Sequence, residues 1–240
     1  MEIVKMKTWI FDVDSTLTPP RSKIDDDFEK FFYEWILCND TYLCSGSDID
    51  KLKEQLTPRI LNNVKGVFTC MANAYYESGE EVYRKAFEPP VGLKEDLEYL
   101  LLASQYEKRT GNHIEKRIGI WNFSVVGRNA NKEERKHYKN WDEKHGSRKT
   151  ISAYLNSRYK DTVEVSIGGD ISIDICNLGR DKRQVVEHLS DLDFSNVTFI
   201  GDRIHRGGND YELAKAIEDR AGKSINVDDW EQTKNILLKA

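Results

Sequence analysis

The sequence contains few cysteines and no long apolar segment. Only four cysteines occur among the 240 residues, and their spacing matches no metal-binding motif: Cys38, Cys44, Cys70 and Cys176. We expect them to be reduced and mostly buried, as in a cytoplasmic protein. No apolar run approaches the roughly 20 residues that span a bilayer. The first residues, "MEIVKMKTWIFD", carry charges and pass directly into a predicted strand, so we expect no signal peptide.

A strong excess of charge of one sign is also lacking. The net charge is −5, with 39% hydrophobic and 32% charged residues, which is typical of a soluble globular protein. This balance argues against nucleic acid or a membrane as the partner, although an acidic protein still binds small anions where its basic residues converge. Internal repeats and low-complexity segments are absent. The length suffices for one large domain or two smaller ones.

Both ends of the chain alternate between strand and helix patterns. The pattern of residues 8–11 predicts a buried strand, and "SKIDDDFEKFFYEWIL" predicts a helix with Ser22 as its N-cap. "TYLC" predicts a second strand, which is followed by a helix capped by Ser47 or Asp48. "GVFTC" predicts a third strand. From Lys182 the alternation returns with "KRQVVEHL", "VTFIGD", "DYELAKAI", "SINV" and a terminal helix. This alternation predicts a parallel, doubly wound α/β sheet.

The middle of the chain has a different character. "HIEKRI" and "WNFSVVG" predict an antiparallel pair joined near Gly119, residues 131–158 a charged helical stretch, and "TVEVSIGGDISIDI" a hairpin with a Gly-Gly turn. We therefore predict an inserted α+β cap domain over residues 81–181. The α/β core is then discontinuous, over residues 1–80 and 182–240.

One hydrophobic strand ends in paired carboxylates, in "WIFDVDSTLTPPR", where Asp12 and Asp14 are separated by one residue. Two other predicted strands end in polar residues, in "CSGSD" and "FIGD", and Lys182 precedes a helix. Because ligands bind at the carboxyl edge of a parallel sheet, we expect these groups to converge. Carboxylates are typical Mg²⁺ ligands, and a lysine with a helix N-terminus holds phosphate. The pattern predicts Mg²⁺-assisted phosphoryl transfer, in which one aspartate attacks phosphorus and the other moves a proton. A structural turn is the alternative role for the two aspartates.

Four ordered motifs resemble those of the haloacid dehalogenase superfamily: "FDVDSTLTPPR", "CSGSD", "RDKR" and "FIGDRIHRGGND". Two further stretches, "HIEKRIGIWNFSVVGRNANKEER" and "VEVSIGGDISIDI", are similar to eukaryotic-type phosphomannomutases, and the likeness covers nearly the whole chain. The resemblance implies a haloacid-dehalogenase-like Rossmannoid α/β core with a parallel sheet. It also implies that the inserted α+β cap sets the substrate class.

The resemblance implies roles for residues of the core. Asp12 would be the nucleophile that becomes an aspartyl-phosphate, and Asp14 the general acid/base. Mg²⁺ would be held by Asp12, the backbone carbonyl of Asp14 and Asp202. The remaining implied residues support the metal or contact the transferring phosphoryl group: Asn209 and Asp210 for the first role, and Lys182, Arg21 and Ser45 or Ser47 for the second. Helix capping is the alternative role for one of the serines and for Asp210.

The resemblance also implies a substrate site in the cap. Arg117, Arg128 and Arg135 match arginines that hold the second phosphate of the sugar, and Ser172 and Asp174 match residues that contact the sugar or its phosphate. A guanidinium group is a planar fork suited to a phosphate dianion. Three such groups on adjacent elements can converge on one anion, whereas each alone is read as a solvated surface charge.

Three stretches depart from the family pattern. In one, "SGSD" stands where the family usually has "GGSD", which supplies a second hydroxyl. Ser15 replaces the glycine of D-x-D-G-T, which the turn tolerates unless it requires a positive φ. "TCMAN" replaces the usual Glu-Asn-Gly near the junction of core and cap, which puts the hinge geometry in question.

Together these features predict a Mg²⁺-dependent enzyme that interconverts mannose 6-phosphate and mannose 1-phosphate, with a hexose 1,6-bisphosphate as activator. A sugar-phosphate phosphatase on the same scaffold is the alternative, because the aspartyl-phosphate can meet water instead of a sugar hydroxyl. A non-catalytic sugar-phosphate binder is a third possibility, disfavoured by the intact acidic motifs. The resemblance further implies a cytoplasmic homodimer joined through the cap domains.

Overall fold

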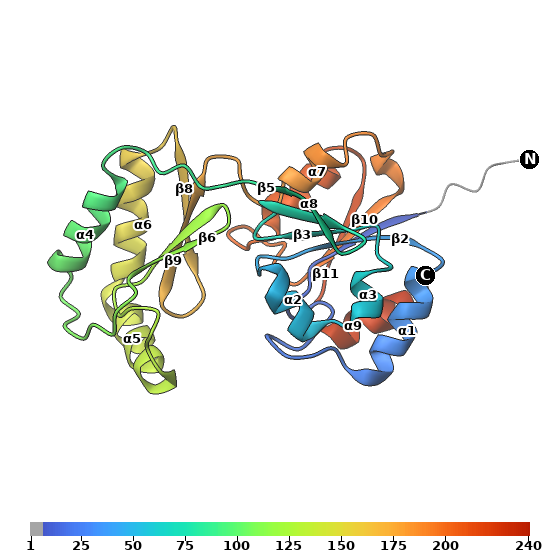
Figure 1. Ribbon diagram of the computed structural model, residues 1–240, viewed down its shortest axis with the longest axis horizontal. Helices are drawn as coiled ribbons and strands as arrows, with labels where there is room; N and C mark the ends of the chain where they lie inside the picture. Colours follow the sequence, from blue (N-terminus) through green and yellow to red (C-terminus); the bar gives the residue numbers. More distant parts are fainter. Residues whose placement is uncertain (1–6) are drawn as a thin grey trace, which may run out of the picture. The chain divides into compact units, whose positions relative to one another are not determined.

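The computed structural model describes residues 7–240, which divide into two compact units. The core unit consists of the residues up to Arg84 together with Arg180–Ala240, and the cap unit is Lys85–Gly179. Figure 1 shows the chain leaving the core unit after β5 (Glu80–Arg84) and returning before α7 (Gln184–His188). The first crossing lies later than residue 80 because β5 pairs with the core sheet.

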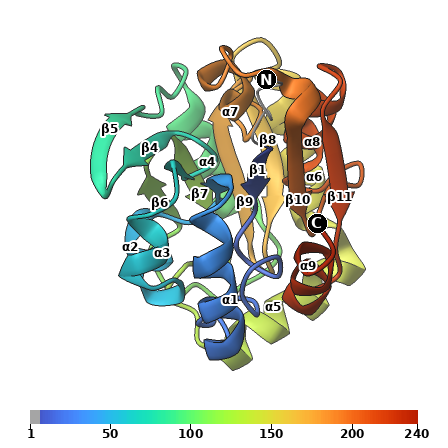
Figure 2. The same ribbon diagram turned by 90° about the vertical axis from the view of Figure 1, so that its right-hand side faces the viewer.

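The core unit is built on a seven-stranded sheet in the order β11-β10-β1-β2-β3-β4-β5. The first five strands in this order pair in parallel, and β4 and β5 add an antiparallel edge, as Figure 2 shows across the sheet. The expected α/β fold with a mostly parallel sheet is therefore confirmed. The other strands are β1 (Thr8–Phe11), β2 (Asp40–Cys44), β3 (Gly66–Thr69), β4 (Ala74–Glu77), β10 (Val197–Gly201) and β11 (Lys223–Asn226).

Helices cover both faces of this sheet (Figure 1). On one face, Phe11 packs edge-on against Phe32 with ring centroids 5.4 Å apart. On the other, Ile10 joins a cluster with residues such as Val185 and Leu213. Side chains of β1 thus alternate between two apolar layers, as a buried central strand requires. The helices are α1 (Asp26–Ile36), α2 (Ile49–Gln55), α3 (Pro58–Leu61) and α9 (Trp230–Leu237) on the first face, and α7 and α8 (Tyr211–Glu218) on the second, with a 3-10 turn at Phe194–Asn196.

Two helices begin later than the simplest cap assignments predict. The prediction of Ser22 as the N-cap of α1 is wrong, because the carboxylate of Asp25 accepts hydrogen bonds from the amides of Asp27 and Phe28 at 3.1 and 2.9 Å. At α2, Asp48 rather than Ser47 is the cap, and it accepts from the amide of Lys51 at 2.9 Å. Aspartate caps also place negative charge at the positive end of the helix dipole.

The hairpin of β4 and β5 was not predicted. Its turn residues, Ser78 and Gly79, have φ angles of 50° and 83°, the geometry that lets a two-residue loop match the twist of its strands. The segment "AYYESGEEVYR" reads as polar and irregular because β5 lies at the sheet edge, where most of its side chains are exposed.

The cap unit pairs β6 (Ile114–Arg117), β7 (Ile120–Phe123), β9 (Ser172–Asn177) and β8 (Val163–Gly168) in that order in an antiparallel sheet. Three helices lie on one side of this sheet in Figure 1: α4 (Leu93–Ala103), α5 (Lys132–His145) and α6 (Ser147–Arg158). The single helical stretch predicted over 131–158 is split at Gly146, whose φ is 64°.

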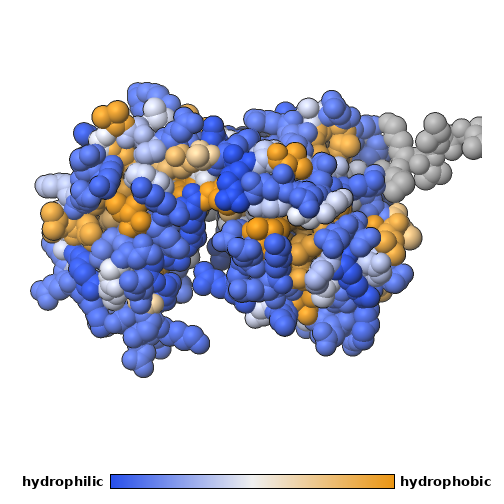
Figure 3. Space-filling model, viewed as in Figure 1, coloured by the Kyte–Doolittle hydropathy of each residue, from blue (hydrophilic) through white to orange (hydrophobic). Residues whose placement is uncertain are grey.

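The outer surface of both units is mainly hydrophilic on the face shown in Figure 3, with scattered apolar groups. Among residues 7–240, no helix is long and apolar enough to cross a membrane. Of the four cysteines, Cys44 and Cys70 are buried and Cys176 is half-buried, whereas Cys38 is exposed.

Candidate active site

Parallel pairing brings the polar strand ends of the core unit together. Asp12 follows β1, and its amide donates to the carbonyl of Ile200 on β10 at 2.9 Å. Asp202 directly follows β10, and Asp210 begins the segment that leads into α8. The carboxylates of Asp12, Asp202 and Asp210 each offer an oxygen within 4.8 Å of the others. The two predicted acidic motifs, "FDVD" and "GDRIHRGGND", therefore meet in one cluster.

Lys182 provides the positive charge of this cluster. Its side chain is fully buried, and its Nζ lies 2.5 Å from Oδ1 of Asp12 and 2.5 Å from Oδ1 of Asp210. Asp210 occupies the N-cap position of α8, but its side chain makes no capping hydrogen bond. Its Oδ2 instead accepts from the amide of Arg203 at 3.2 Å, beside Asp202. The side chain of Asp210 therefore positions the lysine and the loop that carries Asp202.

Burial raises the pKa of Asp12 to about 8, with the carboxylates of Asp210 and Asp202 adding to the effect and the ammonium group of Lys182 opposing it. The pKa of Asp202 is likewise raised, first by burial and then by Asp210. Burial lowers the pKa of Lys182, but its two carboxylate partners outweigh this and hold the pKa well above its usual value.

Lys182 contacts Asp12 and Asp210, whereas the carboxylate of Asp202 lies 3.6 Å from Nε of the exposed Arg203. Three carboxylates thus surround one buried cation, and the cluster carries an excess of negative charge. Closely spaced carboxylate oxygens are the hard donors that Mg²⁺ binds. The donor set of this chain fits a divalent cation held by Asp12 and Asp202, the position that the sequence predicted.

Asp14 lies two residues beyond the nucleophile candidate, in a turn built around Val13. The carbonyl of Val13 accepts from the amides of Leu17 and Thr18 at 2.9 and 3.1 Å. Within this turn Ser15 has a φ of 64°. The turn therefore does require a positive φ at the position where the family has glycine. For serine this left-handed conformation costs roughly 1–2 kcal/mol relative to an ordinary right-handed or extended one.

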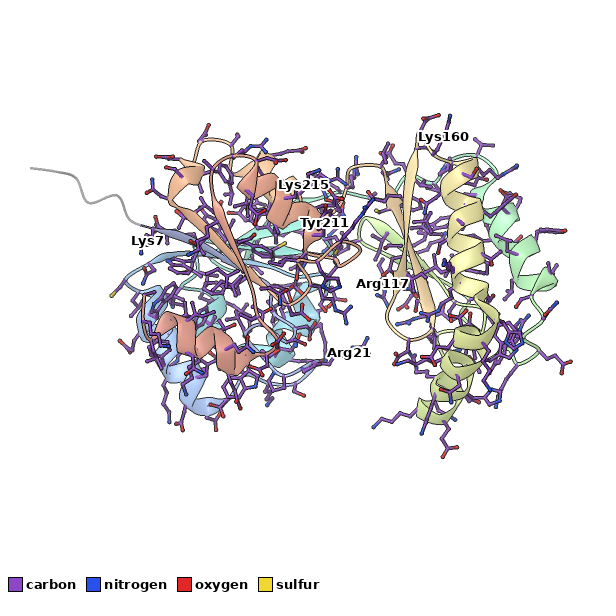
Figure 4. All side chains as sticks on the ribbon, turned by 180° about the vertical axis from the view of Figure 1, so that it is seen from behind. Lys7, Arg21, Arg117, Lys160, Tyr211 and Lys215 are labelled. Carbon is purple, nitrogen blue, oxygen red and sulfur yellow. The ribbon has the colours of Figure 1, made fainter. Side chains whose placement is uncertain are left out.

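The carboxylate of Asp14 is held on one side. Its Oδ1 accepts hydrogen bonds from the backbone amide of Arg21 and from Nε2 of Gln55, both at 2.8 Å. The Arg21 side chain itself is exposed and extends away from the core unit (Figure 4). Asn209, the other residue predicted to support the metal beside Asp210, is also exposed.

Ser45 and Ser47 lie in the loop between β2 and α2. Ser45 is buried, and its hydroxyl accepts from the amide of Ser47 at 3.0 Å. A second loop is hydrogen-bonded to this one, because the amides of Cys70 and Met71 donate to the carbonyls of Ser47 and Ser45 at 2.9 and 3.1 Å.

This second loop is the segment "TCMAN". Three of its consecutive residues, Cys70, Met71 and Ala72, have φ angles of 53°, 59° and 63°. Left-handed conformation in three non-glycine residues is sterically costly. The departure from Glu-Asn-Gly thus lies directly against the loop of the candidate phosphate-contacting serines.

In the cap unit, the sheet face opposite the helices carries the predicted substrate residues. Alternation along β7 and β9 turns Trp121, Phe123, Ile173 and Ile175 into the apolar core. The opposite face of the sheet, which we call the open face, carries Glu115, Arg117, Asn122, Ser172 and Asp174. Arg117 is labelled on this side of the sheet in Figure 4.

Glu115 gathers two of the predicted arginines. Its Oε2 lies 2.8 Å from Nη2 of Arg117 and 2.7 Å from Nε of Arg128. Arg128 also donates from Nη1 to the hydroxyl of Ser172 at 2.7 Å. Although burial opposes the shift, these arginines hold the pKa of Glu115 below its usual value. Glu115 therefore brings the two guanidinium groups together.

Glu115, Asn122 and Asp174 lie in one row across the neighbouring strands β6, β7 and β9. Nδ2 of Asn122 donates to Oδ1 of Asp174 at 2.5 Å. Burial raises the pKa of Asp174, and the hydrogen bond from Asn122 together with Arg117 and Arg128 counteracts this only in part. The open face thus combines cations with an acceptor, which suits a phosphorylated polyol.

Arg135 occupies a different position from the other two arginines. Its Nε and Nη2 donate to the backbone carbonyls of Ala130 and Arg128, each at 2.8 Å. These contacts fix the loop that carries Arg128.

Three residues of these sites were missed by the sequence reading: Gln55, Glu115 and Asn122. The period-two pattern of "HIEKR" and "WNF" could have placed Glu115 and Asn122 on the same face as Arg117. Nothing local marks Gln55, because it is 41 residues from Asp14.

The fold has relatives among solved structures. The chain superposes on a haloacid dehalogenase-like hydrolase from Bacteroides thetaiotaomicron with a TM-score of 0.61 and 13% identity, covering 97% of this chain and 100% of the other. The C-terminal domain of trehalose-6-phosphate phosphatase from C. albicans gives a TM-score of 0.66 and 16% identity over 97% and 90% of the two chains. At these identities the likeness establishes the fold alone.

Sequence relatives are more specific. The family model for eukaryotic phosphomannomutase matches residues 30–239. Phosphomannomutase 1 of Dictyostelium discoideum is 30% identical over 99% of this chain and 97% of its own length. The phosphomannomutase of Spinacia oleracea is 32% identical over 95% of each chain, and that of Saccharomyces cerevisiae is 32% identical over 85% of this chain and 83% of its own. Because the match spans both units and accompanies a haloacid dehalogenase-like fold, the chain belongs to the eukaryotic phosphomannomutase family.

Proposed function

We propose that the protein interconverts mannose 6-phosphate and mannose 1-phosphate through a phosphorylated Asp12. The observation that carries the proposal is the presence, in a chain of this family, of cationic groups at two separate places suited to phosphate. In the core, the ammonium group of Lys182 lies beside the proposed nucleophile Asp12, and in the cap Arg117 and Arg128 converge on Glu115. A mutase needs both, because the phosphate that is not reacting has to be held elsewhere.

The first half-reaction transfers the phosphoryl group to the protein. A carboxylate oxygen of Asp12 attacks phosphorus, the bond between phosphorus and the sugar oxygen breaks, and Asp14 supplies the proton that this oxygen takes up. Lys182 lies against Asp12 and balances negative charge on the phosphoryl oxygens. Ser45 or Ser47 contacts the same oxygens from the loop after β2.

The second half-reaction reverses these roles. A hydroxyl at the other end of the sugar gives its proton to Asp14 and attacks the phosphorus of the aspartyl-phosphate, which regenerates the Asp12 carboxylate. When bound by Asp12, Asp202 and the carbonyl of Asp14, Mg²⁺ supplies positive charge at the phosphoryl group. A hexose 1,6-bisphosphate is the activator proposed to phosphorylate Asp12 first.

The cap residues hold the part of the substrate that does not react. Arg117 and Arg128 are proposed to bind the distal phosphate in place of their shared partner Glu115, and Ser172 and Asp174 to contact the sugar or this phosphate. Arg135 contributes by fixing the loop of Arg128. The family resemblance further supports a cytoplasmic homodimer joined through the cap units, which light scattering of the purified protein tests.

The decisive experiment supplies mannose 1-phosphate, Mg²⁺ and a catalytic amount of glucose 1,6-bisphosphate, and follows mannose 6-phosphate and free phosphate together. Isomer formation that exceeds phosphate release is the expected result, and Asp12→Asn should abolish it. Release of phosphate with no isomer formed would replace the mutase by a sugar-phosphate phosphatase. Binding of the sugar phosphate without either product would leave only a binding protein.

A further inference from the structure

Gln55 joins two parts of the candidate active site that are distant in the sequence. It is the last residue of α2, the helix that directly follows the loop of Ser45 and Ser47. Its side chain is 2% exposed, and its backbone carbonyl is anchored by the amide of Ile24 at 2.9 Å. Gln55 is therefore held in place independently of the contacts that its amide group makes.

The amide group of Gln55 points at Asp14. Its Nε2 lies 2.8 Å from Oδ1 of Asp14 and 3.1 Å from the hydroxyl oxygen of Thr18. Oδ1 of Asp14 already accepts from the backbone amide of Arg21, so it is an acceptor and the NH₂ side of the Gln55 amide faces it. The opposite oxygen, Oε1, is buried and has no hydrogen-bond partner in the described chain. The amide thus leaves its own carbonyl unsatisfied while it donates to Asp14.

The two oxygens of Asp14 are consequently inequivalent. Oδ1 accepts from Gln55 and also from the backbone amide of Arg21 at 2.8 Å. Within residues 7–240, no hydrogen bond to Oδ2 is formed. Two donors on one oxygen fix the plane and the rotation of the carboxylate, and they leave the other oxygen to the reacting group.

From this geometry we infer that Gln55 is a positioning residue for the proposed acid/base Asp14, acting by presenting Oδ2 to the sugar oxygen that leaves or attacks. The inference rests on the proposed role of Asp14, and it extends that role to a residue outside the acidic motifs. Because α2 carries the serine loop at its start and Gln55 at its end, one helix sets both the phosphate contact and the orientation of the acid/base.

The test exploits the leaving group. A phenolate such as that of p-nitrophenyl phosphate departs without a proton, whereas phenyl phosphate and sugar phosphates need one. Gln55→Met keeps the side-chain length and removes the donor. In single-turnover measurements of Asp12 phosphorylation, we expect this variant to lose about tenfold to a hundredfold with phenyl phosphate and mannose 1-phosphate. The loss with p-nitrophenyl phosphate should stay within about twofold, with KM unchanged.

Thr18→Val is the matched control, because it removes the other acceptor of the same amide and leaves the contact with Asp14. It should keep both rates near those of the wild type. Gln55→Leu, which also removes the donor and carries no charge, should reproduce the selective loss if Gln55→Met fails to fold. Equal loss with both esters, or a loss confined to KM, would show that Gln55 supports the fold or binding and would overturn the inference.

The two phenyl esters keep this test separate from the proposed function. If the wild type forms no mannose 6-phosphate, the mutase proposal fails, yet the selective loss with phenyl phosphate still reports on Gln55. If isomerisation is normal in Gln55→Met, the positioning role is wrong and the mutase proposal stands.

Discussion

The ammonium group of Lys182 lies 2.5 Å from the carboxylate of Asp210, and neither side chain is exposed to solvent. A charge in such a place is tolerated only while its partner is present, because neither group can be hydrated. The pair therefore links the stability of the core unit to the geometry of the site, since the same lysine also contacts Asp12.

Asp210→Ala should lower the free energy of unfolding by about 3–5 kcal/mol, because it leaves Lys182 with one buried partner fewer. Urea denaturation followed by circular dichroism measures this. The triple variant Asp12→Asn/Lys182→Met/Asp210→Leu removes all three buried charges and should recover most of the stability while remaining inactive. If Asp210→Ala alone unfolds at the wild-type urea concentration, the pair does not contribute to stability.

Ser15→Gly should stabilise the protein by about 0.5–1 kcal/mol, because relief of the left-handed strain exceeds the entropy that glycine adds to the unfolded chain. The motivating observation is the φ of 64° at Ser15. Ser104, with a φ of −69°, provides the control, and Ser104→Gly should destabilise instead. Equal changes in melting temperature for the two variants would contradict the assignment of strain to Ser15.

The pH dependence of stability should reveal the environment of Asp174. Burial raises its pKa, so the stability associated with the protonated carboxyl is present in acid and is lost as the pH rises through the folded-state pKa. Asp174→Asn keeps an acceptor for Asn122 and carries no charge. The stability of this variant relative to the wild type should therefore increase from acidic to neutral pH.

Denaturation of both proteins across this pH range checks the sign of the effect. Asp142→Asn is a useful comparison, since it removes a cap-unit carboxylate that is paired with Arg148 at 2.7 Å. That variant should be destabilised, because the buried guanidinium group of Arg148 loses its charged partner. A relative stability of Asp174→Asn that falls toward neutral pH would mean that its arginine neighbours outweigh burial.

The arrangement of the core site was predictable because its polar residues directly follow the ends of strands. Asp12, Ser45 and Asp202 each end a hydrophobic run, and parallel strands bring such ends to one edge. The antiparallel hairpin after β3 escaped prediction because β5 is exposed and lacks a strong apolar alternation. The N-cap of α1 was misplaced because Ser22 and the acids after it are all competent caps, and only tertiary packing selects Asp25.

The supporting contacts could not be read from the sequence. Gln55 meets Asp14 across 41 residues, and the hydrogen bond between Asn122 and Asp174 spans 52. Such pairs depend on sheet register and on where a helix ends, which local patterns do not determine. The sequence likewise did not determine which of the three predicted arginines share a partner. Arg117 and Arg128 meet at Glu115, whereas Arg135 turns to backbone carbonyls.

Arg128→Ala should separate the proposed distal phosphate site from the reaction site. Loss of one charge-assisted contact costs about 1.5–3 kcal/mol, or roughly tenfold to a hundredfold in affinity. We expect kcat/KM for mannose 1-phosphate isomerisation to fall by this factor. Hydrolysis of p-nitrophenyl phosphate, which has no distal phosphate, should change by less than about twofold. Both rates are measured on the same preparation.

Lys139→Ala is the control for this variant, because it removes one positive charge from the same unit at an exposed ion pair with Asp170. Exposed pairs contribute little, so both rates should persist. Arg128 also donates to Ser172, and its loss could loosen the open face of the cap sheet. Thermal denaturation resolves this point: a selective loss of isomerisation at an unchanged melting temperature supports a phosphate contact. A parallel fall in both rates with a lower melting temperature would assign Arg128 to the fold of the cap.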